Sequence, residues 1–203
     1  YPHTPGIDAS GEVVHSNSSN FKEGDEVLVT GYDFGMNTSG GFAEYVRVPA
    51  EWPIKLPNGL SLKESMMLGT AGFTAGMSID KIVKNIKPED GAIVVSGATG
   101  GVGSLSIAIL AKLGYHVVAV TGKKDEEEEY LTNLGAKEVL ARQEFGEENK
   151  RPMLKGLFAG AVDTVGGTVL DNIIKSTNHL GVVTSCGNAA SVSYTHLTLP
   201  TNT

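Results

Sequence analysis

The sequence predicts an α/β protein in which a small all-β unit precedes a doubly wound parallel sheet. Three observations indicate this fold: short apolar runs separated by turn residues before residue 47, strands that alternate with helices between residues 91 and 187, and a glycine-rich turn at 97–103. Near-continuous β-branched runs are typical of parallel strands that helices cover on both faces. We therefore expect two units that differ in architecture.

The first unit has the spacing of short strands. Between Gly6 and Arg47, apolar runs lie at 12–14, 26–29 and 40–46, and turn residues separate them. We expect these three runs to be strands.

A second unit is predicted to begin after Pro57. Ser61 and Glu64 have the spacing of a capping box, and apolar residues then recur at helical intervals through 66–68. We place the domains at 1–65 and 66–190. Residues 191–203 lose the alternation and resemble translated adapter sequence, so they are left out of the fold prediction.

Strands and helices then alternate along the second unit. The predicted strands are 92–95, 116–120, 138–140, 161–163 and 181–185, and the predicted helices are 102–113, near 126–134 and near 169–178. This order predicts parallel pairing, with helices on both faces of one sheet.

The glycine-rich turn lies between the first of these strands and the helix that follows it. Glycines at 97, 100 and 103 allow a tight turn, close approach of backbone amides to a pyrophosphate, and close packing of helix on strand. Because the strand, the helix and a second strand are all present, the motif predicts a dinucleotide site.

The end of the second strand indicates which dinucleotide is bound. A carboxylate there would accept from a free ribose 2′-hydroxyl, but this chain has Gly122, Lys123 and Lys124. Cations favour a 2′-phosphate and therefore NADP(H), with Lys123 the first choice and Lys124 the second. Arg142, just past the third strand, could add a further charge.

Five separated motifs together carry a family resemblance. They are PGIDASGEV at 5–13, GFAEY at 41–45, GTAGFTA at 69–75, the turn at 97–103 and DTVG at 163–166. In this order they resemble the medium-chain dehydrogenase/reductase superfamily and, within it, the YhdH/YhfP-type quinone oxidoreductase-like proteins. The resemblance covers about residues 1–190.

The resemblance implies a Rossmann-like nucleotide domain preceded by part of a chaperonin-10-like catalytic domain, with the nicotinamide in the cleft between them. It also implies that opening strands, an asparagine-containing segment and the last strands of the nucleotide domain are missing. The chain also starts without methionine and runs directly into a glycine turn, so we interpret it as a fragment, which the resemblance implies is truncated at both ends.

Site residues follow from the resemblance and from strand-end positions. Asp8 and Tyr32 are the predicted catalytic residues. Asp8 could instead fix a turn or pair with a basic residue, and Tyr32 could line the substrate mouth. Thr70 is expected beside the nicotinamide. The predicted cofactor-binding residues are Thr70, Gly97, Thr99, Gly100, Gly101, Val102, Gly103, Gly122, Lys123, Lys124, Arg142, Asp163, Val165, Gly166, Cys186 and Gly187.

Composition excludes several classes of partner and of site. With 16 basic and 23 acidic residues the net charge is -7, which argues against nucleic acid and anionic membranes. One cysteine and five histidines without ligand spacing predict no metal site. The single cysteine also favours a reducing cytoplasm.

The predicted function is an NADPH-dependent, zinc-independent reductase. Without a metal, hydride transfer favours an acceptor that spreads charge by conjugation, and the resemblance implies reduction of acryloyl-CoA to propionyl-CoA by hydride transfer to the β-carbon. The alternatives are an NADPH:quinone oxidoreductase and a nucleotide-binding module without turnover. The resemblance further implies a small-molecule acceptor as partner and a homodimer in the complete protein.

Overall fold

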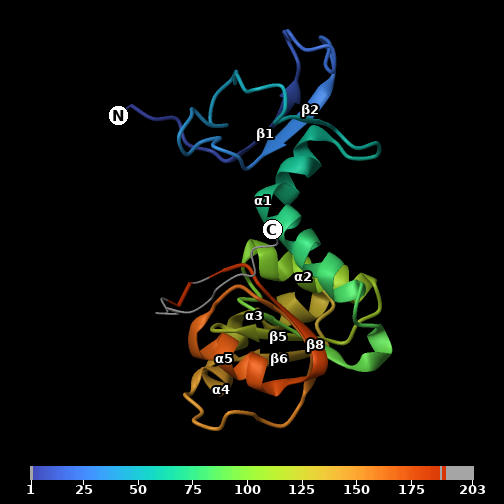
Figure 1. Cartoon of the computed structure of the whole chain (residues 1–203), viewed down its shortest axis with the longest axis vertical. Coiled ribbons are helices and arrows are strands. Elements are labelled where there is room, and N and C mark those ends of the chain that lie inside the picture. Colours follow the sequence, from blue (N-terminus) through green and yellow to red (C-terminus); the bar gives the residue numbers. More distant parts are fainter. Residues whose placement is uncertain (1, 188, 191–203) are drawn as a thin grey trace, which may run out of the picture. The chain divides into compact units, whose positions relative to one another are not determined.

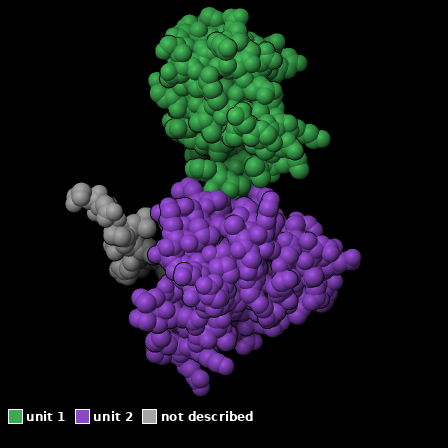
Figure 2. Space-filling model, turned by 90° about the vertical axis from the view of Figure 1, so that its right-hand side faces the viewer, with its two compact units in different colours: residues 1–73 green, residues 74–203 purple. Residues whose placement is uncertain are grey.

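The chain forms two compact units, Tyr1–Phe73 and Thr74–Thr203 (Figure 2). The computed structural model describes residues 2–187 and 189–190, so the tail at 191–203 lies outside the described residues. Helix α1 (Leu62–Val83) spans the division. The domain limits placed from the sequence at residues 65 and 66 stay a prediction.

The first unit contains an antiparallel sheet of three strands in the order β1-β2-β3. They are β1 (Asp8–Glu12), β2 (Glu26–Thr30) and β3 (Ile54–Lys55). The strand predicted at 26–29 is confirmed. The one predicted at 12–14 was wrong in position, because Val13 already exchanges turn hydrogen bonds with Gly24 and Asp25 after β1 has ended.

The strand predicted at 40–46 is absent from the structure. Backbone amides at 40–42 donate to carbonyl oxygens at 4–6, but the amide of Ala43 turns back to the carbonyl of Gly41. A Cβ on Gly40 or Gly41 would lie 2.3 Å from the carbonyl oxygen of Gly6 or Asp8, respectively. Glycine at these two positions therefore allows two irregular backbone segments to pack closely. The apolar pattern of the sequence does not distinguish such a segment from a strand.

The second unit is built on a parallel five-stranded sheet, as the sequence predicted. The structure gives the strand order as β6-β5-β4-β7-β8. The strands are β4 (Ala92–Ser96), β5 (Val117–Thr121), β6 (Glu138–Ala141), β7 (Phe158–Asp163) and β8 (Thr177–Ser185). Along the chain, β5 and β6 are added on one side of β4, and β7 and β8 are then added on its other side. The carboxyl ends of β4 and β7 thus flank the reversal, where open α/β sheets bind ligands.

Helices cover both faces of this sheet (Figure 1). They are α2 (Gly101–Lys112), α3 (Lys124–Asn133), α4 (Arg142–Gly146) and α5 (Gly167–Ser176), and a 3-10 turn lies at Pro88–Asp90. One core layer contains Ile82 of α1, Leu110 of α2 and Leu131 of α3. Ile173 of α5 and Phe145 of α4 pack in the other. Helix α4 was not predicted, because five residues are too few to show a helical period.

Candidate functional site

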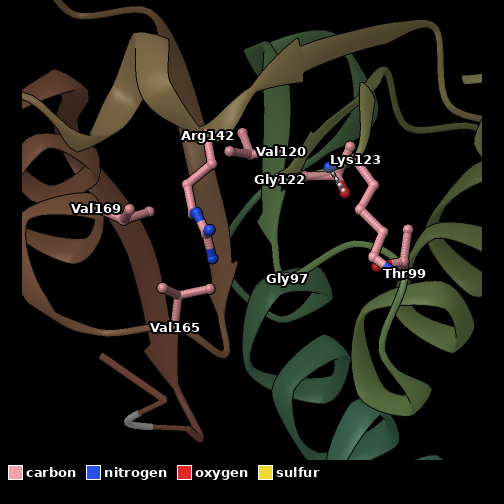
Figure 3. Close-up of a pocket in the computed structure, with 9 residues that line it drawn as sticks. Gly97, Thr99, Val120, Gly122, Lys123, Arg142, Val165 and Val169 are labelled. Atoms are coloured by element: carbon pink, nitrogen blue, oxygen red, sulfur yellow. Dashed lines mark hydrogen bonds between the residues drawn. The ribbon is translucent and has the colours of Figure 1, made fainter. Parts of the chain in front are cut away.

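A pocket of about 340 Å³ lies at the carboxyl edge of the parallel sheet, among the segments that follow β4, β5, β6 and β7 (Figure 3). Its lining residues are Gly97, Thr99, Val120, Thr121, Gly122, Lys123, Arg142, Val165 and Val169. The sequence named all of these except Val120, Thr121 and Val169. Thr121 could have been found from its place at the end of β5, where its hydroxyl accepts from the amide of Lys123 at 3.1 Å.

The glycine-rich loop has the backbone geometry that its sequence predicted. Gly97 adopts a φ of 60°, and a Cβ there would lie 2.1 Å from Thr164 Oγ1. A Cβ on Gly103 would lie 2.3 Å from the carbonyl oxygen of Gly97. Glycine is thus required for the tight turn at one position and for close packing of α2 on the loop at the other.

The start of helix α2 faces this loop. Gly100 is its N-cap residue and has no side-chain cap, and Gly101 and Val102 belong to the first turn. The first amides of a helix have no partner within it, and the helix dipole makes this end positive. The loop and helix start therefore suit an anionic group such as a phosphate.

Two cations line the pocket. The Arg142 guanidinium packs against Gly122, such that a Cβ on this glycine would lie 3.0 Å from Arg142 Nη2. Figure 3 shows the Lys123 side chain extending in the direction of Thr99. Among the described residues, neither cation has an ion-pair partner, and no carboxylate lines the pocket. Lys124 begins α3 and is not a lining residue.

At the end of β7, some residues lie at the pocket and others lie in the interior of the second unit. Val165 lines the pocket, and Gly166, with a φ of 76°, is the N-cap of α5. Asp163 is fully buried beneath them. Its carboxylate accepts hydrogen bonds from Ser96 Oγ at 2.5 Å and from the Gly166 amide at 2.9 Å. Ser96 was not among the site residues predicted from the sequence.

Asp8 and Thr70 were assigned separate roles from the sequence, and the first unit brings them together. The carboxylate of Asp8 accepts from the backbone amide of Thr70 at 2.9 Å and from its hydroxyl at 2.7 Å. Helix α1 is broken immediately before, at Gly69, with a φ of 49° and a ψ of -154°. Asp8 therefore binds the first turn after the break.

Tyr32 also lies in the first unit, directly after β2, as expected. It adopts a φ of 56°, an uncommon conformation for a bulky residue. Its ring stacks on Trp52 with centroids 5.2 Å apart and planes within 4°. Its catalytic role stays a prediction, and Trp52 was not foreseen as its partner.

Cys186 and Gly187 follow β8. The Cys186 thiol donates to the carbonyl oxygen of Asp163 at 3.5 Å, and burial raises the pKa of this thiol above its ordinary value. A Cβ on Gly187 would lie 2.2 Å from the carbonyl oxygen of Thr164. Both residues therefore pack against the segment after β7, and neither lines the pocket.

The described residues contain neither a cluster of metal-ligating side chains nor a helix suited to span a membrane. No group of three or more His, Cys, Asp and Glu side chains within residues 2–187 and 189–190 is arranged to hold a metal ion. No helix in the same part of the chain has both the length and the apolar character that a membrane span requires.

Two family models match the chain. The alcohol dehydrogenase GroES-like domain matches residues 1–58, and the zinc-binding dehydrogenase model matches residues 101–202. The two matches follow the order predicted from the sequence, a β unit before a nucleotide-binding fold.

Curated relatives cover nearly the whole chain. The chain is 46% identical over 99% of its length to the probable acrylyl-CoA reductase AcuI of Escherichia coli, and covers 60% of that protein. It is 45% identical over 92% of its length to the putative quinone oxidoreductase YhfP of Bacillus subtilis, and covers 57% of it. The chain thus spans about three fifths of the length of these relatives.

A solved structure agrees with the sequence matches. The yhdH oxidoreductase from Salmonella enterica, in complex with NADP, superposes with a TM-score of 0.90 and 47% identity, over 93% of this chain and 58% of the other. The family model over residues 101–202 accounts for half of the chain and includes α2, which follows the glycine-rich loop. By its sequence and its fold, the chain belongs to the zinc-binding dehydrogenase family of the medium-chain dehydrogenase/reductase superfamily.

Proposed function

We propose that the chain binds NADP(H) and forms part of a reductase that acts on activated carbon–carbon double bonds, with acryloyl-CoA as the substrate. The observation that carries the cofactor assignment is the pocket wall at Gly122, Lys123 and Arg142, which has two cations and no carboxylate. A carboxylate at this place would favour the free ribose 2′-hydroxyl of NAD(H). Two cations favour a 2′-phosphate instead.

The residues present fit the cofactor. Gly97 and Gly103 allow the tight turn and the close packing of α2 on the loop. The uncapped start of α2 favours the negative charge of a pyrophosphate. Arg142 and Lys123 would hold the 2′-phosphate, and Val165 and Val169 provide apolar lining. Bound NADPH would supply the hydride that adds to the β-carbon of an enoyl thioester.

Support for the acceptor comes from the AcuI relative, which is named as a probable acrylyl-CoA reductase. A quinone is the second candidate, because YhfP is named as a putative quinone oxidoreductase at nearly the same identity. Both acceptors are conjugated, so neither needs a metal to hold the developing charge. Independence from zinc, a cytoplasmic location, a homodimer and the absence of nucleic-acid and membrane partners remain part of the proposal.

The test measures NADPH consumption by the complete protein with acryloyl-CoA and with simple quinones, and repeats it with NADH. We expect turnover with acryloyl-CoA, faster with NADPH than with NADH. Turnover with quinones alone would favour the second candidate. NADPH binding without turnover on any acceptor would favour a module that binds nucleotide without chemistry.

A further inference from the structure

We propose that Ser96 and Asp163 are positioning residues that join the loop after β4 to the loop after β7, and so set the shape of the pocket. Both loops contribute to its lining, Gly97 and Thr99 from the first and Val165 from the second. The identity of the ligand rests on the proposed function. The connection between the loops does not.

Ser96 and Asp163 are the last residues of neighbouring parallel strands. Backbone pairing of β4 with β7 ends at Val95 and Val162, one residue earlier. Ser96 Oγ donates to Asp163 Oδ1 at 2.5 Å, and both residues are fully buried. The side-chain bond therefore continues the connection of the two strands beyond the point at which their backbones stop pairing.

Asp163 also organises the turn on its own side. Its Oδ1 accepts from the amide of Val165 at 3.3 Å, and its Oδ2 accepts from the amide of Gly166 at 2.9 Å. The hydrogen bonds from Ser96, Val165 and Gly166 all come from neutral donors. None of the four ion pairs in the described part of the chain includes Asp163. Burying a carboxylate without a cation is costly, so this geometry must be held by the surrounding donors.

Thr164 connects the same two loops through two further hydrogen bonds. Its amide donates to Ser96 Oγ at 3.0 Å, and its hydroxyl donates to the carbonyl oxygen of Ser96 at 3.1 Å. The Thr164 hydroxyl occupies the space that a Cβ on Gly97 would need. Gly97 is therefore glycine partly because Thr164 stands beside it, and a shift of either loop would move the other.

An amide at position 163 cannot replace the carboxylate. In either orientation an Asn side chain would turn its NH₂ group toward a backbone N–H, that of Gly166 or that of Val165, and one donor would lose its acceptor. Asp163→Asn should therefore loosen the turn after β7 while keeping the volume of the side chain. Ser96→Ala tests the connection from the other strand.

The main measurement is hydrogen exchange in the 203-residue chain without nucleotide. The amides of Ala98 and Gly100 bond to the carbonyl oxygens of Val120 and Gly97, so their exchange reports on the loop after β4. In Asp163→Asn, whose substitution lies on β7, we expect both amides to exchange about tenfold faster relative to amides inside β5, as one weakened hydrogen bond implies. Ser96→Ala should do the same.

The matched control is Tyr115→Phe, which removes another buried hydrogen bond, the 2.6 Å bond from the Tyr115 hydroxyl to the carbonyl oxygen of Ile86. It should not accelerate the two loop amides relative to β5. Thr164→Val should accelerate them, and Thr164→Ser, which keeps the hydroxyl, should restore the original exchange. Should Asp163→Asn fail to fold, Ser96→Ala and Thr164→Val carry the same test.

Binding is measured second, by titrating NADPH at a temperature at which every variant is folded. We expect Asp163→Asn and Ser96→Ala each to raise the dissociation constant about tenfold, and the double variant to bind no more weakly than the weaker single variant. Equal loop exchange in all variants, or faster exchange with unchanged NADPH affinity, would overturn the proposal. A parent chain that binds no NADPH would overturn the proposed function instead, and the exchange result would still decide whether the loops are joined.

Discussion

Asp8 holds Thr70 through two hydrogen bonds, although 62 positions separate them in the sequence. Asp8 begins β1, and Thr70 follows the break in helix α1 at Gly69. A Cβ on Gly69 would lie 2.8 Å from Asp8 Oδ2, so a side chain at the break in α1 would collide with the carboxylate of Asp8. The pair ties the sheet of the first unit to its helix.

We expect Asp8→Ala to destabilise the chain, because it leaves the Thr70 amide and hydroxyl without their acceptor. The loss should be about 1–3 kcal/mol in the free energy of unfolding, measured by urea titration with circular dichroism. Thr70→Val is the matched variant, since it removes only the hydroxyl bond and should cost less. A stable Asp8→Ala protein with greatly reduced turnover would instead support the catalytic role predicted from the sequence.

Lys123→Asp should weaken NADPH binding far more than NADH binding. The change places a carboxylate in the lining of the pocket that Arg142 shares, and the expected loss is about 1.5–3 kcal/mol for NADPH. Fluorescence titration with both nucleotides measures the difference. Lys124→Asp carries the same change of charge outside the pocket lining and should have a smaller effect. Equal effects at the two positions would contradict the assignment of Lys123.

Gly103→Ala should impair both folding and nucleotide binding. The new methyl group would lie 2.3 Å from the carbonyl oxygen of Gly97, so α2 or the loop must shift. Gly76→Ala is the control, because it also lies inside a helix but has nothing within 4 Å of the new Cβ. There we expect a gain of about 1 kcal/mol from helix propensity. Thermal unfolding and NADPH titration of both variants would check this, and normal binding by Gly103→Ala would contradict it.

Cys186 should react slowly with iodoacetamide, even though it is an exposed residue. Burial raises the pKa of its thiol, the charge of Asp163 raises it further, and a hydrogen bond with Ser78 lowers it. Only the thiolate reacts with iodoacetamide. The pH at which the alkylation rate rises should therefore be higher for the folded chain than for the chain unfolded in urea. Above the thiol's ordinary pKa of 9.0 the unfolded chain loses this proton first, so stability should fall as the pH rises.

The Ser78→Ala variant provides the control for this titration. Removing the hydrogen bond that lowers the pKa of Cys186 should move the midpoint of alkylation to still higher pH. A midpoint at or below that of the unfolded chain would show that the thiol is activated, and Cys186 would then need a role in chemistry.

Much of the second unit could be predicted from sequence because its signals are local. Runs such as 92–95 and 117–120 are apolar and mostly β-branched, which follows from burial on both faces. Pocket residues such as Gly97, Lys123 and Arg142 follow strand ends, and parallel strands bring their carboxyl ends to one edge. The position of a residue in its own element was therefore enough to find them.

What was missed depends on contacts between distant segments. The segment at 40–46 is a largely apolar run that follows turn residues, as a short strand does, yet its glycines pack against the backbone of residues 4–8, which no local pattern encodes. Asp8 and Thr70 were both chosen, but their bond depends on a break in α1 that a helical period hides. Val169 was missed because an apolar residue in the first turns of a helix looks like any core residue.

The stacked pair of Tyr32 and Trp52 makes the first unit spectroscopically distinct. Trp52 is the one tryptophan among the 203 residues, and its ring lies against a tyrosine within the unit Tyr1–Phe73. Indole emission therefore reports on that unit alone, whereas far-ultraviolet ellipticity is weighted toward the helices of the other. Followed together during denaturation, the two signals separate the melting of one unit from that of the other without any label.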